Sequence, residues 1–181
     1  DGSGNLIHLS PNQSPFVEDE LLLASAPATD EMTDLVEVNN VLYIGSADNS
    51  MLVMRYDISN SVWLTPWSVM DNVMHTVAAP SSQGATTLLF AMEGSPVVEE
   101  MDTSGNSIQT YDGTNGCYPS TTDILSVAAN DDHLVLSLES GVFVHFDRVT
   151  GGCTSYDTTN GLPTSFVGDV ALVDTTAYMA T

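Results

Sequence analysis

The segment Tyr111-Asp112-Gly113-Thr114-Asn115-Gly116 recurs as Tyr156-Asp157-Thr158-Thr159-Asn160-Gly161, 45 residues further along the chain. A second feature, an aspartate followed by a turn of small residues, has the same spacing. Asp57, Asp102 and Asp147 lie 45 residues apart, and Asp1 precedes Asp57 by 56 residues. Because independent features share one period, the chain is interpreted as a series of repeats of about 45 residues.

Each period contains short apolar runs separated by Gly, Asn, Asp and Ser, which is the pattern of short β-strands and turns. In the third full period the pattern predicts strands at Ile124–Ala128, His133–Leu138, Gly141–Asp147 and Cys153–Tyr156. Four strands per period of about 45 residues are typical of a propeller blade. The predicted fold class is therefore all-β, a β-propeller with four-stranded antiparallel blades, about four of them represented and three complete.

The recurring aspartate is expected to form the turn between the third and fourth strands of each blade. Its carboxylate accepts a hydrogen bond from the backbone two residues on, and a following Gly or Asn adopts positive φ. Metal ligation by these carboxylates is the alternative interpretation.

The whole chain, 1–181, is predicted to be a single propeller domain or a partial propeller. Blade repeats are placed at about 34–66, 74–112 and 123–157, with partial blades at 1–10 and 167–181. The longer first interval contains one helical candidate, Val17–Ser25. The sequence starts before a fourth strand and ends after a second one, so we expect a fragment of a larger propeller. The remaining blades would lie on the parent chain or on another chain.

The charge balance is strongly acidic. The 181 residues include 24 Asp and Glu but only 2 Lys and Arg, for a formal net charge of -22. Nucleic acid, heparin-like polysaccharide and anionic membranes are excluded as partners because each requires clustered Lys or Arg. A hydrophobic fraction of 43% is enough for a core and argues against disorder.

The third period also resembles a known repeat. The run Gly141-Val142-Phe143-Val144-His145-Phe146-Asp147, then Thr150-Gly151, then the segment 156–170 with Gly161-Leu162-Pro163, resembles the two-component-regulator propeller repeat. Tyr43-Ile44-Gly45-Ser46 stands where that family ends its repeat in Trp-Ile-Gly-Thr. The resemblance implies a propeller that senses or binds a ligand in the periplasm, outside the cell or at its surface, and it carries no catalytic residues.

Two cysteines, Cys117 and Cys153, are 36 residues apart. They are either one disulfide of a secreted protein or two buried thiols.

The candidate metal site is Asn130-Asp131-Asp132, at a predicted hairpin tip where three oxygen-bearing side chains can converge. Ca²⁺ would suit these ligands, but a solvated turn is the simpler interpretation, and no cofactor is otherwise expected. His133 and His145 fall on strands expected to be adjacent, and they are interpreted as packed or surface residues. The sequence has no H-E-x-x-H, C-x-x-C or G-x-S-x-G motif.

The candidate ligand-binding residues are aromatic. Trp63 and Trp67 flank Pro66 near the end of a fourth strand, and Tyr118 occupies the equivalent loop one blade later. Exposed aromatic rings near Asp and Asn would bind a neutral glycan, a peptide or a protein partner. The alternative is that the tryptophans pack between blades.

Two functional hypotheses follow. The first is a non-enzymatic propeller outside the cell or in the periplasm that binds a ligand or organises partners. The second is a fragment of a propeller enzyme, a lyase or glycoside-active protein, with its site at the central axis. His75 is the only histidine on the predicted inner strands, which favours the first hypothesis.

Overall fold

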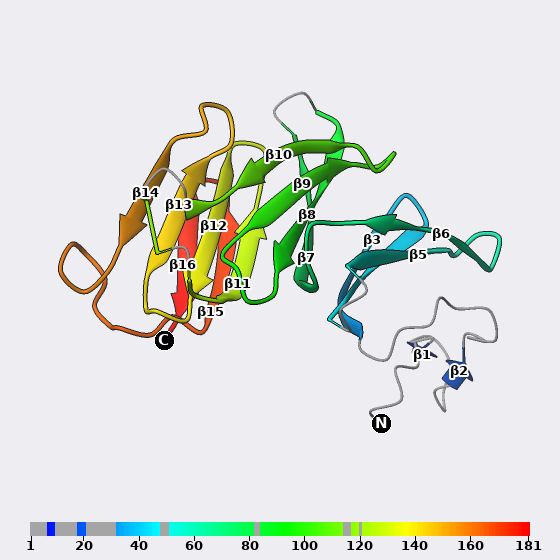
Figure 1. Cartoon of the computed structure of the whole chain (residues 1–181), viewed down its shortest axis with the longest axis horizontal. Helices are drawn as coiled ribbons and strands as arrows, with labels where there is room; N and C mark the ends of the chain where they lie inside the picture. Colours follow the sequence, from blue (N-terminus) through cyan, green and yellow to red (C-terminus); the bar gives the residue numbers. More distant parts are fainter. Residues whose placement is uncertain are drawn as a thin grey trace.

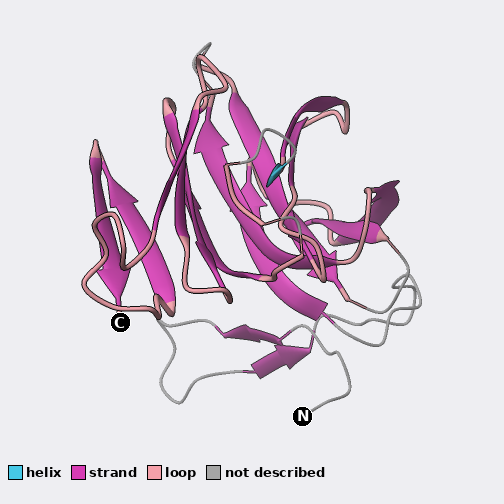
Figure 2. Cartoon of the chain, turned by 60° about the vertical axis from the view of Figure 1, so that its left-hand side comes forward, coloured by secondary structure: helices cyan, strands magenta, loops and turns pink. Residues whose placement is uncertain are grey.

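The computed structural model of the chain describes residues 7–9, 18–20, 32–47, 51–81, 84–113, 117–119 and 121–181. These residues form antiparallel β-sheets and contain no α-helix, so the predicted all-β class is confirmed (Figures 1 and 2). The described part of the chain accordingly has no helix able to cross a membrane.

Three sheets have four strands each, hydrogen-bonded in the order in which they occur along the chain. Sheet I contains β3 (Met32–Val38), β4 (Val41–Ser46), β5 (Leu52–Asp57) and β6 (Val62–Ser68). Sheet II contains β7 (Val73–Pro80), β8 (Thr86–Met92), β9 (Val98–Asp102) and β10 (Ser107–Tyr111). Sheet III contains β11 (Ile124–Ala129), β12 (His133–Leu138), β13 (Phe143–Asp147) and β14 (Cys153–Tyr156).

Two further sheets have two strands each. The C-terminal hairpin consists of β15 (Asp169–Val173) and β16 (Thr176–Ala180), and near the other end β1 (Ile7–Leu9) pairs with β2 (Glu18–Glu20).

The recurring aspartates form the turns between third and fourth strands, as predicted. Asp102 Oδ1 accepts hydrogen bonds from the backbone N–H groups of Ser104 at 2.8 Å and Asn106 at 2.9 Å. Asp147 Oδ1 accepts from Val149 and Thr150, both at 2.9 Å. The Asn106 side-chain amide also donates to Asp102 Oδ2 at 2.7 Å. This bond and the backbone hydrogen bonds lower the pKa of the two carboxyl groups, because they favour the charged form.

The sheets pack in chain order, and the first strand of each contacts the first strand of the next (Figure 1). Side chains join these first strands. The N–H of Thr76 on β7 donates to Asp34 Oδ2 on β3 at 2.9 Å, and the N–H of Val170 on β15 donates to Ser126 Oγ on β11 at 3.2 Å. Figure 2 shows the C-terminal hairpin as the outermost layer beside sheet III.

Each gap between consecutive sheets contains its own hydrophobic cluster. The alternation of side chains along a strand explains how one sheet serves two gaps. On β12, Leu134, Leu136 and Leu138 face sheet II, whereas Val135 faces the hairpin. β12 is therefore apolar on both faces, as expected for a strand of an inner layer.

The predicted strands of the third period agree with β11 to β14 to within two residues at each end. The helix predicted at Val17–Ser25 is wrong at Glu18–Glu20, which form β2, and its other residues lie outside the described ones. Pairing with β1 provides these residues with backbone hydrogen bonds that a helix would otherwise have provided. The Asp1 turn also lies outside the described residues. The four consecutive sheets span residues 32–68, 73–111, 124–156 and 169–180.

Candidate functional site

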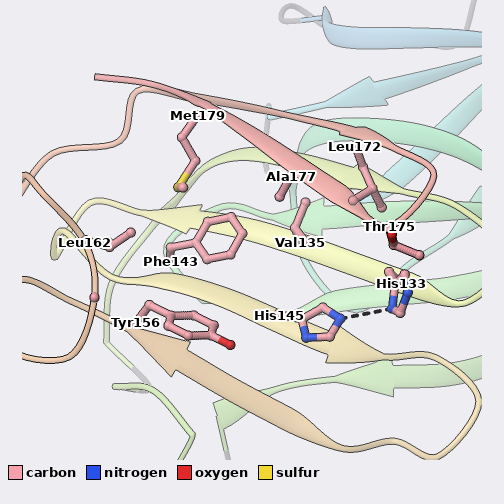
Figure 3. Close-up of a pocket in the computed structure, with 11 residues that line it drawn as sticks. His133, Val135, Phe143, His145, Tyr156, Leu162, Leu172, Thr175, Ala177 and Met179 are labelled. Atoms are coloured by element: carbon pink, nitrogen blue, oxygen red, sulfur yellow. Dashed lines mark hydrogen bonds between the residues drawn. The ribbon is translucent and has the colours of Figure 1, made fainter.

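A pocket of about 470 Å³ lies between sheet III and the C-terminal hairpin (Figure 3). The pocket lies where the four strands of sheet III extend beyond the two strands of the hairpin. The hairpin packs on β11 and β12 and leaves the outer part of that face open. Most of the lining is apolar, contributed by Val135, Phe143, Leu162, Leu172, Ala177 and Met179.

The alternation of side chains along β13 determines which of its residues line the pocket. On β13, Phe143 and His145 point to the hairpin side, because Val144 and Phe146 between and beyond them are part of the core against sheet II. The rings of Phe143 and Tyr156 lie side by side across β13 and β14, with centroids 6.0 Å apart. Figure 3 shows these rings with Leu162 and Met179 towards one end of the pocket and the histidines at the other.

His133 and His145 are joined at the polar end of the pocket. His145 Nε2 lies 3.0 Å from His133 Nδ1, which is hydrogen-bond distance, with the donor set by the tautomers (Figure 3). The pairing follows from the register of β12 and β13, in which His145 is opposite Val135 and His133 is opposite Asp147. Burial and the neighbouring His133 lower the pKa of His145, and the charge of Asp147 only partly opposes them. Both effects favour the neutral form of the His145 ring.

A second cavity, of about 440 Å³, lies between sheets II and III and has a polar wall. Arg148 and Glu100 line it, and both side chains are almost fully buried. Arg148 donates to Glu100 Oε1 at 2.5 Å, to Thr87 Oγ1 at 3.0 Å and to the carbonyl oxygens of Pro80 (2.8 Å) and Asn130. Because these acceptors belong to the protein itself, the cation serves to hold the two sheets together.

Glu100 completes this network. Burial raises the pKa of the Glu100 carboxyl, but hydrogen bonds from Tyr111, Thr87 and Arg148 together lower it to below its ordinary value. Tyr111 Oη donates to Glu100 Oε2 at 2.6 Å, and burial together with that carboxylate raises the pKa of the phenol.

The three aromatic residues proposed from the sequence do not meet in one site. Tyr118 is buried and donates its hydroxyl to the Pro96 carbonyl at 2.6 Å, so its ring is not available as a ligand platform. Trp67 is half-buried and packs against the core between sheets I and II, with the Arg55 guanidinium 4.2 Å from its ring centroid. Trp63 stacks edge-on against Tyr56 at 5.1 Å. The tryptophans thus pack against their own sheet and its neighbour.

The proposed calcium ligands form a hairpin tip. Asn130 Oδ1 accepts hydrogen bonds from the N–H groups of Asp132 at 3.1 Å and His133 at 2.9 Å, whereas its Nδ2 donates to the Asp174 carbonyl. Asp131 and Asp132 are exposed. In the described residues no three His, Cys, Asp or Glu side chains are arranged to hold a metal ion. The Asn130 side-chain oxygen is therefore used in the hydrogen bonds of its own turn.

Cys117 and Cys153 form a disulfide with an S–S distance of 1.94 Å and Cα atoms 6.1 Å apart. It ties the loop that follows sheet II to β14, and both cysteines pack against the core between sheets II and III.

Sequence reasoning placed His133 and His145 on adjacent strands but did not predict their contact. It missed the pairing of Arg148 with Glu100 altogether. The available signal was Arg148 itself, one of only two bases in a chain of net charge -22, positioned directly after a turn aspartate.

No protein-family model matches the chain, and no curated protein matches its sequence. Two of the similar solved structures are computationally designed proteins. The crystal structure of the designed protein Ika8 matches with a TM-score of 0.65 at 15% identity, over 85% of this chain and 44% of Ika8. The designed protein Ika4 matches with a TM-score of 0.64 at 16% identity, over 86% of this chain and 87% of Ika4.

The likeness shows the fold alone. The chain spans less than half the length of Ika8. Because no family model matches, the resemblance to the two-component-regulator propeller repeat stays a prediction.

Proposed function

We propose that the chain is a non-enzymatic β-propeller module, acting outside the cell or in the periplasm, that binds an extended peptide segment of another protein at its C-terminal hairpin. The pocket beside that hairpin is the observation that carries the proposal.

The propeller part rests on the packing of the sheets. Consecutive four-stranded antiparallel sheets with adjacent first strands and one core per gap are what blades around a common axis require.

The binding part rests on the second edge of β16. Among the described strands β16 pairs only with β15, and an added strand would hydrogen-bond to the N–H and C=O groups of its other edge. A peptide strand added there would lie over β13, and alternate side chains would point into the pocket. A volume of about 470 Å³ accommodates more than one large apolar side chain.

Charge selects the class of peptide. A module with net charge -22 attracts basic segments and repels acidic ones. The expected ligand therefore has two apolar residues at alternate positions, flanked by Lys or Arg.

The location rests on the disulfide, which is typical of proteins from oxidising compartments. Nothing favours the enzymatic alternative. Among the described residues, His75 on β7 makes no hydrogen bond to a carboxylate, and His145 bonds to the ring of His133 rather than to a hydroxyl or a carboxylate.

The test is selection of a phage-displayed peptide library on the immobilised chain. Ala177→Trp should fill the pocket and weaken binding of enriched peptides about tenfold or more. Ala171→Trp is the matched control, because Ala171 is exposed and lies opposite Tyr178 on the outward face of the same hairpin. Absence of enrichment, equal binding by both variants, or Ala177-dependent binding only on a neutral-glycan array would overturn the peptide proposal.

A further inference from the structure

The histidine pair at the end of the pocket has the arrangement of a two-nitrogen chelate. We propose that His133 Nδ1 and His145 Nε2 together bind a divalent transition-metal ion, with Cu²⁺ the preferred one. This inference is independent of peptide binding.

The distance between the two nitrogens suits a chelate. Two nitrogen ligands in cis positions, each about 2.0–2.1 Å from a common metal, lie about 2.9 Å apart when the angle between them is 90°. His145 Nε2 and His133 Nδ1 are 3.0 Å apart. The separation of the two nitrogens thus already suits a chelate, and binding requires each ring to turn so that its lone pair points at the ion and not at the other ring.

The two histidines also have a rigid support. His133 and His145 lie on β12 and β13, which are paired by a continuous antiparallel register from His133 opposite Asp147 to Ser137 opposite Phe143. The alternate residues of both strands are fixed in the core against sheet II. Because the two strands already fix the backbone of both histidines, the protein loses little conformational entropy when the histidines bind one metal ion.

The proton between the two rings does not prevent binding, because a metal ion binds neutral imidazole. In the metal-free pair one hydrogen bridges the two nitrogens. On coordination that hydrogen moves to the other nitrogen of the ring that donated it, so the neutral pair releases no net proton.

The groups around the pair favour a cation and leave coordination positions open. The Asp147 carboxylate acts electrostatically on both rings, but its Oδ1 is engaged by the N–H groups of its own turn. Thr175 and Tyr156 are the other polar residues lining the pocket. With no third His, Cys, Asp or Glu ligand among the described residues, water would occupy the remaining positions. Such a site is open on the pocket side, unlike a closed structural zinc site.

Copper is preferred for two reasons. A 90° nitrogen–nitrogen angle fits tetragonal Cu(II), and affinity for imidazole ligands rises to a maximum at Cu²⁺ along the divalent first-row series. Ni²⁺ and Zn²⁺ should bind the same pair more weakly.

The test is titration of the full chain with Cu²⁺ at pH 7.4, followed by calorimetry and electron paramagnetic resonance. We expect one ion bound at the pair and a tetragonal spectrum with nitrogen couplings. His133→Asn and His145→Gln should each weaken that binding about tenfold or more, and lowering the pH to 5.5 should weaken it as the imidazoles protonate. His75→Gln and His8→Gln are the matched controls and should leave the affinity unchanged.

Far-UV circular dichroism of each variant verifies that it is folded. Because the imidazoles are half-buried at the edge of a pocket, their replacement should leave the fold intact. No binding of Cu²⁺, equal affinity in both pair variants and the original chain, or loss of affinity in the His8 or His75 variant instead would overturn the assignment. Zn²⁺ binding tighter than Cu²⁺ would contradict the coordination geometry.

Discussion

Replacing Arg148 with Met should weaken the contact between sheets II and III and so lower the free energy of unfolding. Arg148 and Glu100 are 8% and 4% exposed, and the arginine donates to four acceptors drawn from both sheets and their connecting loops. Met retains much of the apolar stem of the side chain and removes the charge and its hydrogen bonds. The substitution leaves the Glu100 carboxylate buried with only the hydroxyls of Tyr111 and Thr87 as donors.

Breaking a buried ion pair by removing one partner costs about 3–5 kcal/mol, because the remaining charge is desolvated without compensation. We expect a loss in the free energy of unfolding of that size at pH 7, measured by urea denaturation followed by circular dichroism. Adding Glu100→Gln to the Arg148→Met variant removes the unpaired carboxylate charge and should restore most of the lost free energy of unfolding.

The pH dependence has a definite sign. The pKa of Glu100 is lower in the folded protein than its ordinary value, so the pair stabilises the protein at neutral pH. That stabilisation is lost as the pH falls through the lowered folded pKa, and the difference between Arg148→Met and the original chain should shrink in acid. A loss below about 1 kcal/mol at pH 7, or no recovery in the double variant, would refute this account of the contact.

Three further predictions concern the other structural features. Replacing both Cys117 and Cys153 with Ser should lower the free energy of unfolding by about 3–4 kcal/mol, as expected for a closed loop of 36 residues, and an unchanged urea midpoint would contradict this. Gly105→Ala should destabilise more than Gly94→Ala in thermal melts. Both glycines have positive φ, but a Cβ at Gly105 would lie 2.7 Å from the Trp67 ring whereas Gly94 has nothing within 4 Å, so equal losses would show that the Trp67 contact is not tight. The turn aspartates Asp57, Asp102, Asp147 and Asp157 should titrate below their ordinary pKa by NMR, because side-chain and backbone donors hold the charged form. Their contribution to stability is present at neutral pH and disappears as the pH falls, and midpoints at or above the ordinary value would contradict it.

The strands and turns were predictable because their determinants are local. Asp102 and Asp147 bond to backbone groups within four residues in sequence, so turn chemistry and strand length could be inferred from short segments. The failure at Glu18–Glu20 has a related cause. Acidic residues followed by leucines have good helix propensity, and only pairing with the distant Ile7–Leu9 makes them a strand.

The site was less predictable because its determinants are not local. Arg148 and Glu100 are 48 residues apart, and no local pattern fixes which faces of two sheets meet. The sequence places Tyr118 in a loop as a candidate ligand-binding residue, but its ring is buried. Gly113 allows this close packing, because a Cβ there would lie 2.7 Å from the Tyr118 carbonyl oxygen and 3.3 Å from the ring. The His133–His145 contact required the register of β12 and β13 as well as their adjacency.

The central claim is that the pocket beside the C-terminal hairpin is the binding site. The most direct measurement is a crystal structure of the chain bound to a peptide enriched in the phage selection. The account predicts the peptide as a third strand paired with β16, with alternate apolar side chains between Phe143 and Met179. A peptide bound instead beside Trp63 and Trp67, or in the cavity at Arg148, would contradict it.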